Sequence, residues 1–333
     1  MSRRVAVLGA GNWGTTLAHL AATNGHDVTL WSRDPSQCDE INLRHTNERA
    51  TPGFAIAHGV RAVVDLREAT RGAALILFVV PSQAFREVAR AAGEHLVPEQ
   101  LVVHATKGLE LGTHRRMSVV LQEETCARQI GVLAGPNIAA EIQRGEPAGT
   151  TVTTTFPRVF DVAREALASR RLMVFPGDDV LGVELCSALK NVVAIAAGMA
   201  AGMGIGENAK AFLVTRGMSE IARIALSLGA HRATFHGLAG IGDLVVTCAS
   251  TQSRNHRVGA AMARGERLGD VLARLGMVAE GVPGAIAARE LATSQRVDAP
   301  LLERVHRVLY EGLPVQRALD ELMSLAPARE YAP

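Results

Sequence analysis

The sequence predicts an α/β domain built on a parallel sheet, followed by an all-helical domain. In the first half of the chain, short aliphatic and β-branched runs alternate with helical patterns, which is typical of βαβ units. In the second half the strand patterns stop and long helical patterns take over. Apolar residues make up 48% of the chain and aromatic residues only 4%, so small aliphatic side chains must fill the cores, as suits helices packed on a parallel sheet.

The expected strands follow one another through the first half of the chain. They occupy residues 4–8, 28–31, 75–80, 101–104, 130–133, 150–155 and 172–175. A helix is expected from residue 14 to about residue 24, and Pro81 opens another helix that carries Phe85, Val88 and Ala89 on one face. Proline is tolerated at a helix start because its missing N–H would have no partner there.

The length of 333 residues is ample for two domains. Phe175-Pro176-Gly177 follows the last strand pattern, and helical patterns then run nearly to Ala326. We therefore expect a first domain over residues 1–180 and a helical second domain over residues 181–333. The last seven residues resemble a frayed tail.

Charge and cysteine content argue against several partners. The 35 basic and 33 acidic residues are spread along the chain and form no basic stripe of the kind that nucleic acid or an anionic membrane requires. The four cysteines are far apart and show no metal-ligand spacing, so we expect free thiols and no metal site. Since no secretory signal pattern opens the chain, we expect a cytoplasmic protein.

The longest uncharged stretch, residues 192–206, is shorter than the roughly 20 residues that a membrane span needs. We interpret it as a buried helix in which Gly198 and Gly202 allow another backbone to approach closely. We therefore expect neither a membrane span nor a nucleic-acid partner.

A glycine-rich turn follows the first expected strand. Its sequence is Gly9-Ala10-Gly11-Asn12-Trp13-Gly14, and it leads into a helix and a second strand. Such glycines allow a tight turn, let backbone N–H groups approach a pyrophosphate and let the helix pack on the sheet. The helix N-terminus also favours an anion. The first domain is therefore expected to be a Rossmann-like dinucleotide-binding domain.

The residue after the second strand bears on the choice of cofactor. An acidic side chain there would bind the 2′-hydroxyl of NAD, whereas an arginine would accommodate the 2′-phosphate of NADP. Counting from Gly14 leads to Asp34, but the strand ends near Trp31, which puts Ser32 and Arg33 first. We favour NADP, and NAD stays open.

Lysine is rare in this chain: Lys107, Lys190 and Lys210 are the only lysines among 35 basic residues. A lysine ammonium is compact and can release a proton, which a guanidinium cannot do near neutral pH. Lys107 follows an expected strand, as does the Gly135-Pro136-Asn137 turn, so both should face the same sheet edge as the dinucleotide. Lys190 begins a long apolar run and could equally be a proton donor or a simple salt-bridged lysine.

Several runs along the chain resemble NAD(P)-dependent sn-glycerol-3-phosphate dehydrogenases of the bacterial type. They are GAGNWGTTLA, NGHDVTLWSRD, VVPSQAFR, ATKGLE, LAGPNIAAEI, ELCSALKNVVAIAAGMAAGMGIGENAKAFLVTRGMSEI, TFHGLAGIGDLVVTC, SRN and AEGV. The run around Lys190 is the most specific, and the nine runs together span almost the whole chain.

The resemblance implies roles for individual positions. Those implied to bind the dinucleotide are Gly9, Gly11, Asn12, Trp13, Gly14, Arg33, Lys107, Ala139, Arg254, Val278 and Glu280. Those implied to bind the substrate are Lys107, Gly135, Asn137, Lys190, Asp243, Ser253, Arg254 and Asn255. The catalytic group is implied to comprise Lys190 as proton donor and acceptor, Lys107 and Asp243.

The resemblance also implies the reaction, which is reversible reduction of dihydroxyacetone phosphate to sn-glycerol 3-phosphate with NADP or NAD. Such an enzyme would supply glycerol phosphate for phospholipid synthesis and would act on a small molecule. A homodimer is compatible with this assignment, but the sequence does not decide the oligomeric state. Asn12 and Asn137 stand where a small hydroxyl residue is expected, and residues 47–53 lack the usual Tyr-Leu before Pro-Gly.

Two rival functions remain open at this stage. One is a β-hydroxyacid dehydrogenase of the 6-phosphogluconate type, although we find no second arginine cluster to bind a substrate carboxylate. The other is an NADP-sensing regulatory protein without activity, which the retention of Lys107, Lys190 and Asp243 argues against.

Overall fold

The structure is a computed structural model that describes residues 2–276 and 278–325. The expected C-terminal tail lies outside the described residues. Contacts divide the chain into two compact units. Unit 1 comprises residues 1–187 and 229–243, and unit 2 comprises residues 188–228 and 244–333.

Within the described residues, unit 1 contains one eight-stranded sheet in the order β3-β2-β1-β4-β5-β6-β7-β8. The strands are β1 (Arg4–Leu8), β2 (Asp27–Trp31), β3 (Val60–Val63), β4 (Leu75–Phe78), β5 (Leu101–His104), β6 (Gln129–Ala134), β7 (Ala148–Thr153) and β8 (Leu172–Gly177). All neighbouring pairs from β3 to β6 are parallel. The order reverses at β1, and in such sheets ligands bind outside the carboxyl ends of the strands at this point.

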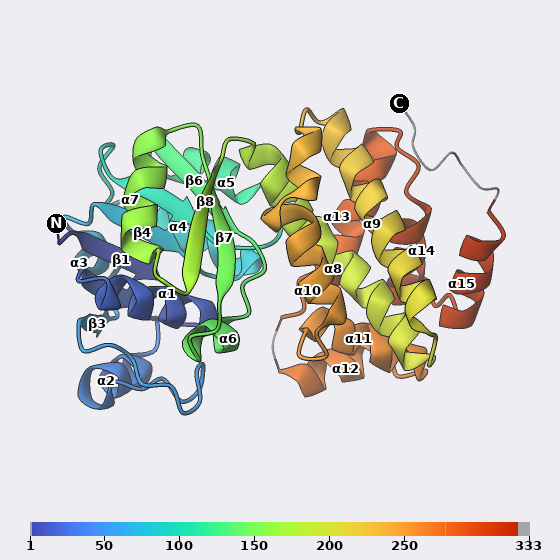
Figure 1. The fold of residues 1–333 in the computed structure, drawn as a ribbon, viewed down its shortest axis with the longest axis horizontal. Helices are drawn as coiled ribbons and strands as arrows, with labels where there is room; N and C mark the ends of the chain where they lie inside the picture. Colours follow the sequence, from blue (N-terminus) through green and yellow to red (C-terminus); the bar gives the residue numbers. More distant parts are fainter. Residues whose placement is uncertain (1, 277, 326–333) are drawn as a thin grey trace. The chain divides into compact units, whose positions relative to one another are not determined.

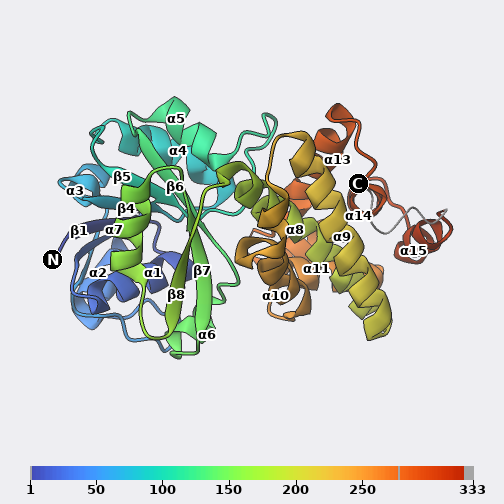
Figure 2. The same cartoon turned by 45° about the horizontal axis from the view of Figure 1, so that its top comes forward.

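Helices cover both faces of this sheet. They are α1 (Asn12–Thr23), α2 (Pro35–Arg44), α3 (Leu66–Thr70), α4 (Ser82–Gly93), α5 (Met117–Glu124), α6 (Ala139–Gln143) and α7 (Pro157–Leu167). One core contains Val5 and Val7 with residues of α1, α2 and α7, while Ala6 and Leu8 belong to a second core with α3, α4 and α5. Alternate side chains of β1 therefore enter opposite cores, which explains why its last four residues are all apolar. Figure 1 shows α1 and α7 against the sheet, and Figure 2 shows α4 and α5 on its other side.

The α/β fold class is confirmed, and each expected strand is present with ends shifted by at most two residues. Two features differ from the expectation. The prediction missed β3, which has only four residues and is interrupted by the exposed Arg61. β7 runs antiparallel to β6, a direction that the expected parallel sheet did not include. A strand pattern records which faces are buried but not the direction of the neighbouring strand.

The segment Gly229–Asp243 belongs to unit 1, although it lies beyond residue 180 in the sequence. It contains two short helices, η1 (Arg232–His236) and η2 (Leu238–Gly242). The buried carboxylate of Asp179 accepts hydrogen bonds from the backbone N–H of His231 (2.8 Å) and the hydroxyl of Thr234 (2.5 Å). Side-chain contacts of this kind between distant segments are not visible in a sequence pattern, so the expected domains of residues 1–180 and 181–333 could not anticipate where the contacts place this segment.

The rest of the described chain is helical, as expected. The helices are α8 (Val180–Gly202), α9 (Glu207–Ser227), α10 (Asp243–Ala249), α11 (Arg254–Ala263), α12 (Leu268–Leu275), α13 (Gly281–Ser294), α14 (Pro300–Tyr310) and α15 (Val315–Met323). By length and composition α8 could cross a membrane, but 89% of its most apolar window is buried within the protein. This burial is typical of a core helix, which is how the sequence analysis interpreted residues 192–206. The helix ends at Gly202, four residues earlier than that stretch.

Glycines bring α8 and α11 into close contact within unit 2. A Cβ atom on Gly198 would overlap the carbonyl oxygen of His256, and one on Gly202 would crowd Ala260 and Ala263. From the other side, a Cβ on Gly259 would overlap the carbonyl oxygen of Ile195. The expected close approach at Gly198 and Gly202 is therefore confirmed.

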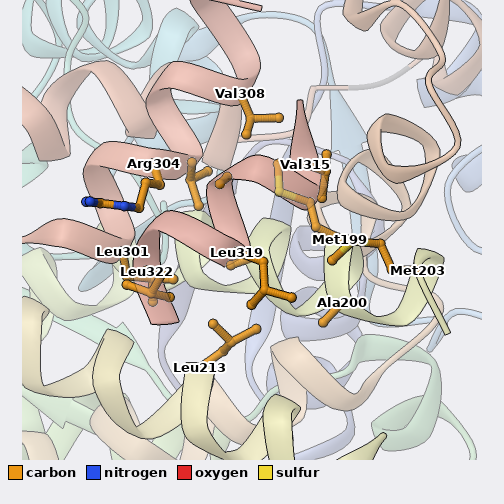
Figure 3. Close-up of a pocket in the computed structure, with 13 residues that line it drawn as sticks. Met199, Ala200, Met203, Leu213, Leu301, Arg304, Val308, Val315, Leu319 and Leu322 are labelled. Carbon is orange, nitrogen blue, oxygen red and sulfur yellow. The ribbon is translucent and has the colours of Figure 1, made fainter. Parts of the chain in front are cut away.

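A small apolar cavity of about 40 Å³ lies elsewhere in unit 2, between α8, α9, α14 and α15. Figure 3 shows aliphatic and methionine side chains around it, with Arg304 as the one charged residue in its lining. A cavity of this size and polarity is a packing defect that an aliphatic core tolerates.

The α8–α11 contact predicts that Gly198→Ala destabilises the protein. The added methyl group must displace backbone atoms of α11, which should lower the free energy of unfolding by about 1–3 kcal/mol. Gly269→Ala is a matched control, because this exposed glycine of α12 has no atom within 4 Å of the added Cβ. The control should be neutral or stabilise by up to about 1 kcal/mol through helix propensity. Urea unfolding of both variants measures the difference, and equal stabilities would contradict the close contact.

Candidate active site

The glycine-rich turn of unit 1 is shaped by two close approaches. Gly9 has a φ of +121°, and a Cβ there would lie 2.5 Å from the carbonyl oxygen of Val79. A Cβ on Gly14 would overlap the carbonyl oxygen of Gly9, so α1 packs directly on the turn. By contrast, no atom lies within 4 Å of the Cβ position of Gly11. Gly9 and Gly14 are thus required by packing, whereas Gly11 leaves open space beside the turn.

This open space lies at the N-terminus of α1. Gly11 is the N-cap residue, no side chain caps the helix, and its first turn contains no acidic residue. Unsatisfied N–H groups and the helix dipole make such a terminus an anion site. The turn therefore fits the pyrophosphate of a dinucleotide, and Asn12 and Trp13, the first two residues of α1, adjoin it.

Asn12 is held in place by a residue that the sequence analysis did not single out. Its Oδ1 accepts a hydrogen bond of 2.9 Å from Nε2 of Gln143, the last residue of α6. Gln143 also donates to Thr16 Oγ1 at 2.7 Å. Asn12, which stands where a small hydroxyl residue is expected, thus connects the start of α1 to the end of α6. Ala139 is the first residue of α6.

The residues after β2 divide between structural and exposed positions. Asp34 is the N-cap of α2 and accepts hydrogen bonds from the backbone N–H (3.0 Å) and the hydroxyl (2.7 Å) of Ser36. The Ser36 hydroxyl is the main reason why the pKa of Asp34 is lowered, and Arg49 lies 3.3 Å from the same carboxylate. Arg33 is exposed. The Asp34 carboxylate therefore caps α2. Of these two residues, Arg33 is the one whose side chain is available to a cofactor ribose or its phosphate.

Lys107 joins three segments of unit 1 at the carboxyl edge of the sheet. Its Nζ lies 2.7 Å from Oδ2 of Asp243 and donates to the carbonyl oxygen of Gly135 at 3.3 Å. Lys107 follows β5 and Gly135 follows β6, which runs parallel to it, so the two loops lie at the same edge as predicted. The Asp243 side chain is 3% exposed and that of Lys107 is 26% exposed, so one end of the ion pair is buried and the other is accessible.

Asn137 lies on the second of these loops. Its Nδ2 donates to the hydroxyl of Thr150 at 2.9 Å, and that hydroxyl lies 3.0 Å from the carbonyl oxygen of Ala134. Gly135 has a φ of +148°, and a Cβ there would lie 3.0 Å from Cα of Thr150. The Gly135-Pro136-Asn137 turn is therefore packed tightly against β7.

A buried charge cluster supports the end of β5, just before Lys107. Glu184 accepts hydrogen bonds from the backbone N–H (2.8 Å) and hydroxyl (2.6 Å) of Ser118 and from Arg116 (2.6 Å), and lies 3.0 Å from His104 Nε2. Burial raises the pKa of the Glu184 carboxyl, but His104, Arg116 and Ser118 more than offset this and lower it overall. The carboxylate thus stays charged and fixes β5 relative to α5.

In unit 2, Lys190 is 2% exposed within α8. Its Nζ donates a hydrogen bond of 2.6 Å to the hydroxyl of Thr247 on α10. Thr247 was missed by the sequence analysis, although it lies four residues after Asp243 in a helix, a spacing that places two residues on one face.

The other expected residues of unit 2 gather near the start of α11 and α13. Ser253 caps α11 by accepting a hydrogen bond from the backbone N–H of His256. The amide of Asn255 donates to Asn191 Oδ1 at 3.0 Å and accepts from the N–H of Gly281 at 2.9 Å. This network ties Asn191, the neighbour of Lys190, to both helices.

Arg254 is the first residue of α11, and its side chain is exposed. Desolvation lowers the pKa of its guanidinium, while the carboxylate of Glu280 raises it. An arginine keeps its proton far above neutral pH, so the side chain is a cation. Glu280 precedes α13, and the nearby Val278 is 40% exposed. These positions offer a cation, a hydroxyl and an amide close together in the sequence, a set suited to binding a phosphate group.

Among the described residues, no group of three or more histidine, cysteine or acidic side chains could hold a metal ion. The expected site residues fall into two sets, one in each unit. One lies around the glycine-rich turn and Lys107 in unit 1, and the other lies around Lys190 and Arg254 in unit 2.

The chain matches one protein family over both halves. Residues 4–159 match the NAD-dependent glycerol-3-phosphate dehydrogenase N-terminus, and residues 179–320 match the C-terminus of the same family. A protein from Enterococcus faecalis named glycerol-3-phosphate dehydrogenase [NAD(P)+] is 43% identical over 328 residues, which cover 97% of this chain and 96% of the relative.

Two solved structures support this match. Glycerol-3-phosphate dehydrogenase from Coxiella burnetii has a TM-score of 0.92 and 35% identity, with 97% of this chain and 99% of that chain covered. The enzyme of that name from Saccharomyces cerevisiae has a TM-score of 0.85 and 28% identity, with 96% and 99% covered. With both family domains matched and relatives aligned over nearly their whole length, the chain belongs to the NAD-dependent glycerol-3-phosphate dehydrogenase family.

Proposed function

We propose that this protein catalyses the reversible reduction of dihydroxyacetone phosphate to sn-glycerol 3-phosphate with NADPH or NADH. The observation that carries the proposal is the buried amine of Lys190, held by Thr247, in a chain that matches this dehydrogenase family over residues 4–159 and 179–320. The substrate is a small molecule, and the cofactor is NAD or NADP, as in the relatives named glycerol-3-phosphate dehydrogenase [NAD(P)+].

The residues of unit 1 fit the dinucleotide. Gly9, Gly11 and Gly14 form the turn at the uncapped N-terminus of α1, and Asn12 and Trp13 adjoin it. Arg33 is proposed to face the ribose and to favour NADP, and its exposure supports this role. The remaining proposed contacts of the cofactor are Lys107, Ala139, Arg254, Val278 and Glu280.

When bound, the nicotinamide supplies or accepts a hydride at C2 of the substrate. In the reduction the substrate oxygen gains negative charge, and we propose that Lys190 gives it a proton while Lys107 adds positive charge. Asp243 holds Lys107 and keeps its amine at the sheet edge. The proposed phosphate contacts are Ser253, Arg254 and Asn255, and Gly135 and Asn137 complete the substrate contacts.

Residues 1–180 carry most of the cofactor contacts, and residues 181–333 carry most of the substrate contacts. The enzyme acts in the cytoplasm, where it supplies glycerol phosphate for phospholipid synthesis. A homodimer is compatible with this proposal.

An absorbance assay of NADPH and NADH oxidation tests the reaction. Purified protein should oxidise either cofactor when dihydroxyacetone phosphate is added. It should also reduce NADP or NAD with sn-glycerol 3-phosphate but not with 6-phosphogluconate, the substrate of the rival dehydrogenase class. Turnover of 6-phosphogluconate would favour that rival, and binding of a dinucleotide without any turnover would favour a sensing protein.

The role of Lys190 predicts different outcomes for two substitutions. Lys190→Ala should lower kcat by about a hundredfold or more, since general acid catalysis contributes 10² to 10⁴ in rate, and should leave dinucleotide binding nearly unchanged. Lys190→Arg should fail as well, because a guanidinium keeps its proton near neutral pH. Steady-state kinetics and fluorescence titration with NADPH measure both effects. Near-normal turnover by the arginine variant would show that the proton comes from another group.

A further inference from the structure

The carbonyl oxygen of Ala10, in the middle of the glycine-rich turn, accepts hydrogen bonds from two side-chain amides. Gln37 Nε2 donates at 2.9 Å and Asn47 Nδ2 donates at 3.0 Å. Gln37 lies on α2, and Asn47 lies in the loop after it, where the sequence departs from the family pattern. Both residues belong to unit 1.

The side-chain amides of Gln37 and Asn47 also form hydrogen bonds with each other and with neighbouring hydroxyl groups. Asn47 is 0% exposed, and its Nδ2 also donates to Thr15 Oγ1 at 2.8 Å. Its Oδ1 accepts a hydrogen bond of 2.8 Å from Gln37 Nε2. The hydroxyl of Ser32, next to Arg33, donates to Gln37 Oε1 at 2.6 Å.

This arrangement fixes the orientation of both amides. A carbonyl oxygen can only accept, so Gln37 and Asn47 must each turn an NH₂ group towards Ala10. The oxygen of each amide then has its own donor, Ser32 for Gln37 and Gln37 for Asn47. No rotation of either amide would keep all of these bonds.

The consequence for the turn follows from the planarity of the peptide bond. In a trans peptide the C=O of Ala10 and the N–H of Gly11 point in opposite directions. Gln37 and Asn47 hold the carbonyl oxygen of Ala10 on their own side of the turn. The N–H of Gly11 therefore points away from these two amides. The Cβ position of Gly11 has no atom of a more distant residue within 4 Å, so open space adjoins this peptide at the uncapped N-terminus of α1.

We propose that Asn47 and Gln37 are positioning residues that aim the N–H of Gly11 at the pyrophosphate of the dinucleotide. The proposal rests on the proposed function only in that a dinucleotide binds at this turn. Ser32 extends the network to the residue beside Arg33, so the same chain of hydrogen bonds connects the pyrophosphate and ribose ends of the cofactor site.

Near-isosteric variants test this role. Asn47→Asp and Gln37→Glu keep the shape of each side chain but remove the donors to Ala10, so the carbonyl oxygen faces a carboxylate. The Kd for NADPH and for NADH, measured by fluorescence titration without substrate, should rise about tenfold or more, and the KM for the cofactor should follow. At saturating cofactor, kcat and the KM for dihydroxyacetone phosphate should stay within about twofold of the wild type. A purely structural role would instead lower the melting temperature and leave the Kd of the folded fraction unchanged.

Asn42→Asp is the matched control. Asn42 also lies on α2, and its amide exchanges hydrogen bonds with the backbone of Ala62 (2.9 and 2.8 Å), away from the turn. Its variant should bind both dinucleotides within about twofold of the wild type. Gln37 is less buried than Asn47, so Gln37→Glu remains informative if Asn47→Asp does not fold.

The outcomes separate this inference from the proposed reaction. Unchanged Kd values in Asn47→Asp and Gln37→Glu would overturn the positioning role, as would an equal loss in Asn42→Asp. A wild-type protein that binds NADPH but does not reduce dihydroxyacetone phosphate would contradict only the reaction, because the Kd comparison would still decide the positioning role. A wild-type protein that binds neither dinucleotide would overturn both.

Discussion

The ion pair between Lys107 and Asp243 is the interaction on which the proposed active site depends most. The Asp243 carboxylate is buried, and a buried charge without a partner costs several kcal/mol. The pair therefore holds the segment Gly229–Asp243 at the carboxyl edge of the sheet, far in sequence from the strands it joins. Asp243 is also the first residue of α10.

Much of the fold could be predicted because the strands and helices carry strong local patterns. β4 and the last four residues of β1 are wholly apolar because they are buried on both faces, and α8 is apolar because it is a core helix. The prediction failed where local patterns carry no information. The direction of β7 depends on its neighbour, and the assignment of Gly229–Asp243 to unit 1 depends on side-chain bonds such as that between Asp179 and Thr234.

The site shows the same division. Gly9 and Gly14 could be identified because their packing allows no other residue, and the scarcity of lysine drew attention to Lys107 and Lys190. Their partners were less visible. Threonine is common in this chain, so only the structure distinguishes Thr247, and Asn47 lies in a loop whose sequence suggested a departure from the family rather than a role.

A double-mutant cycle of Lys107→Met and Asp243→Asn tests most directly whether this ion pair acts as one unit in the reaction. We expect each single variant to lower kcat/KM for dihydroxyacetone phosphate by about a hundredfold, since each removes the same charged contact. The double variant should then be no worse than the poorer single variant, because contacting residues that work together show strongly non-additive effects. If the two losses instead multiplied, Lys107 and Asp243 would act independently and the ion pair could not be the constraint on which the site depends.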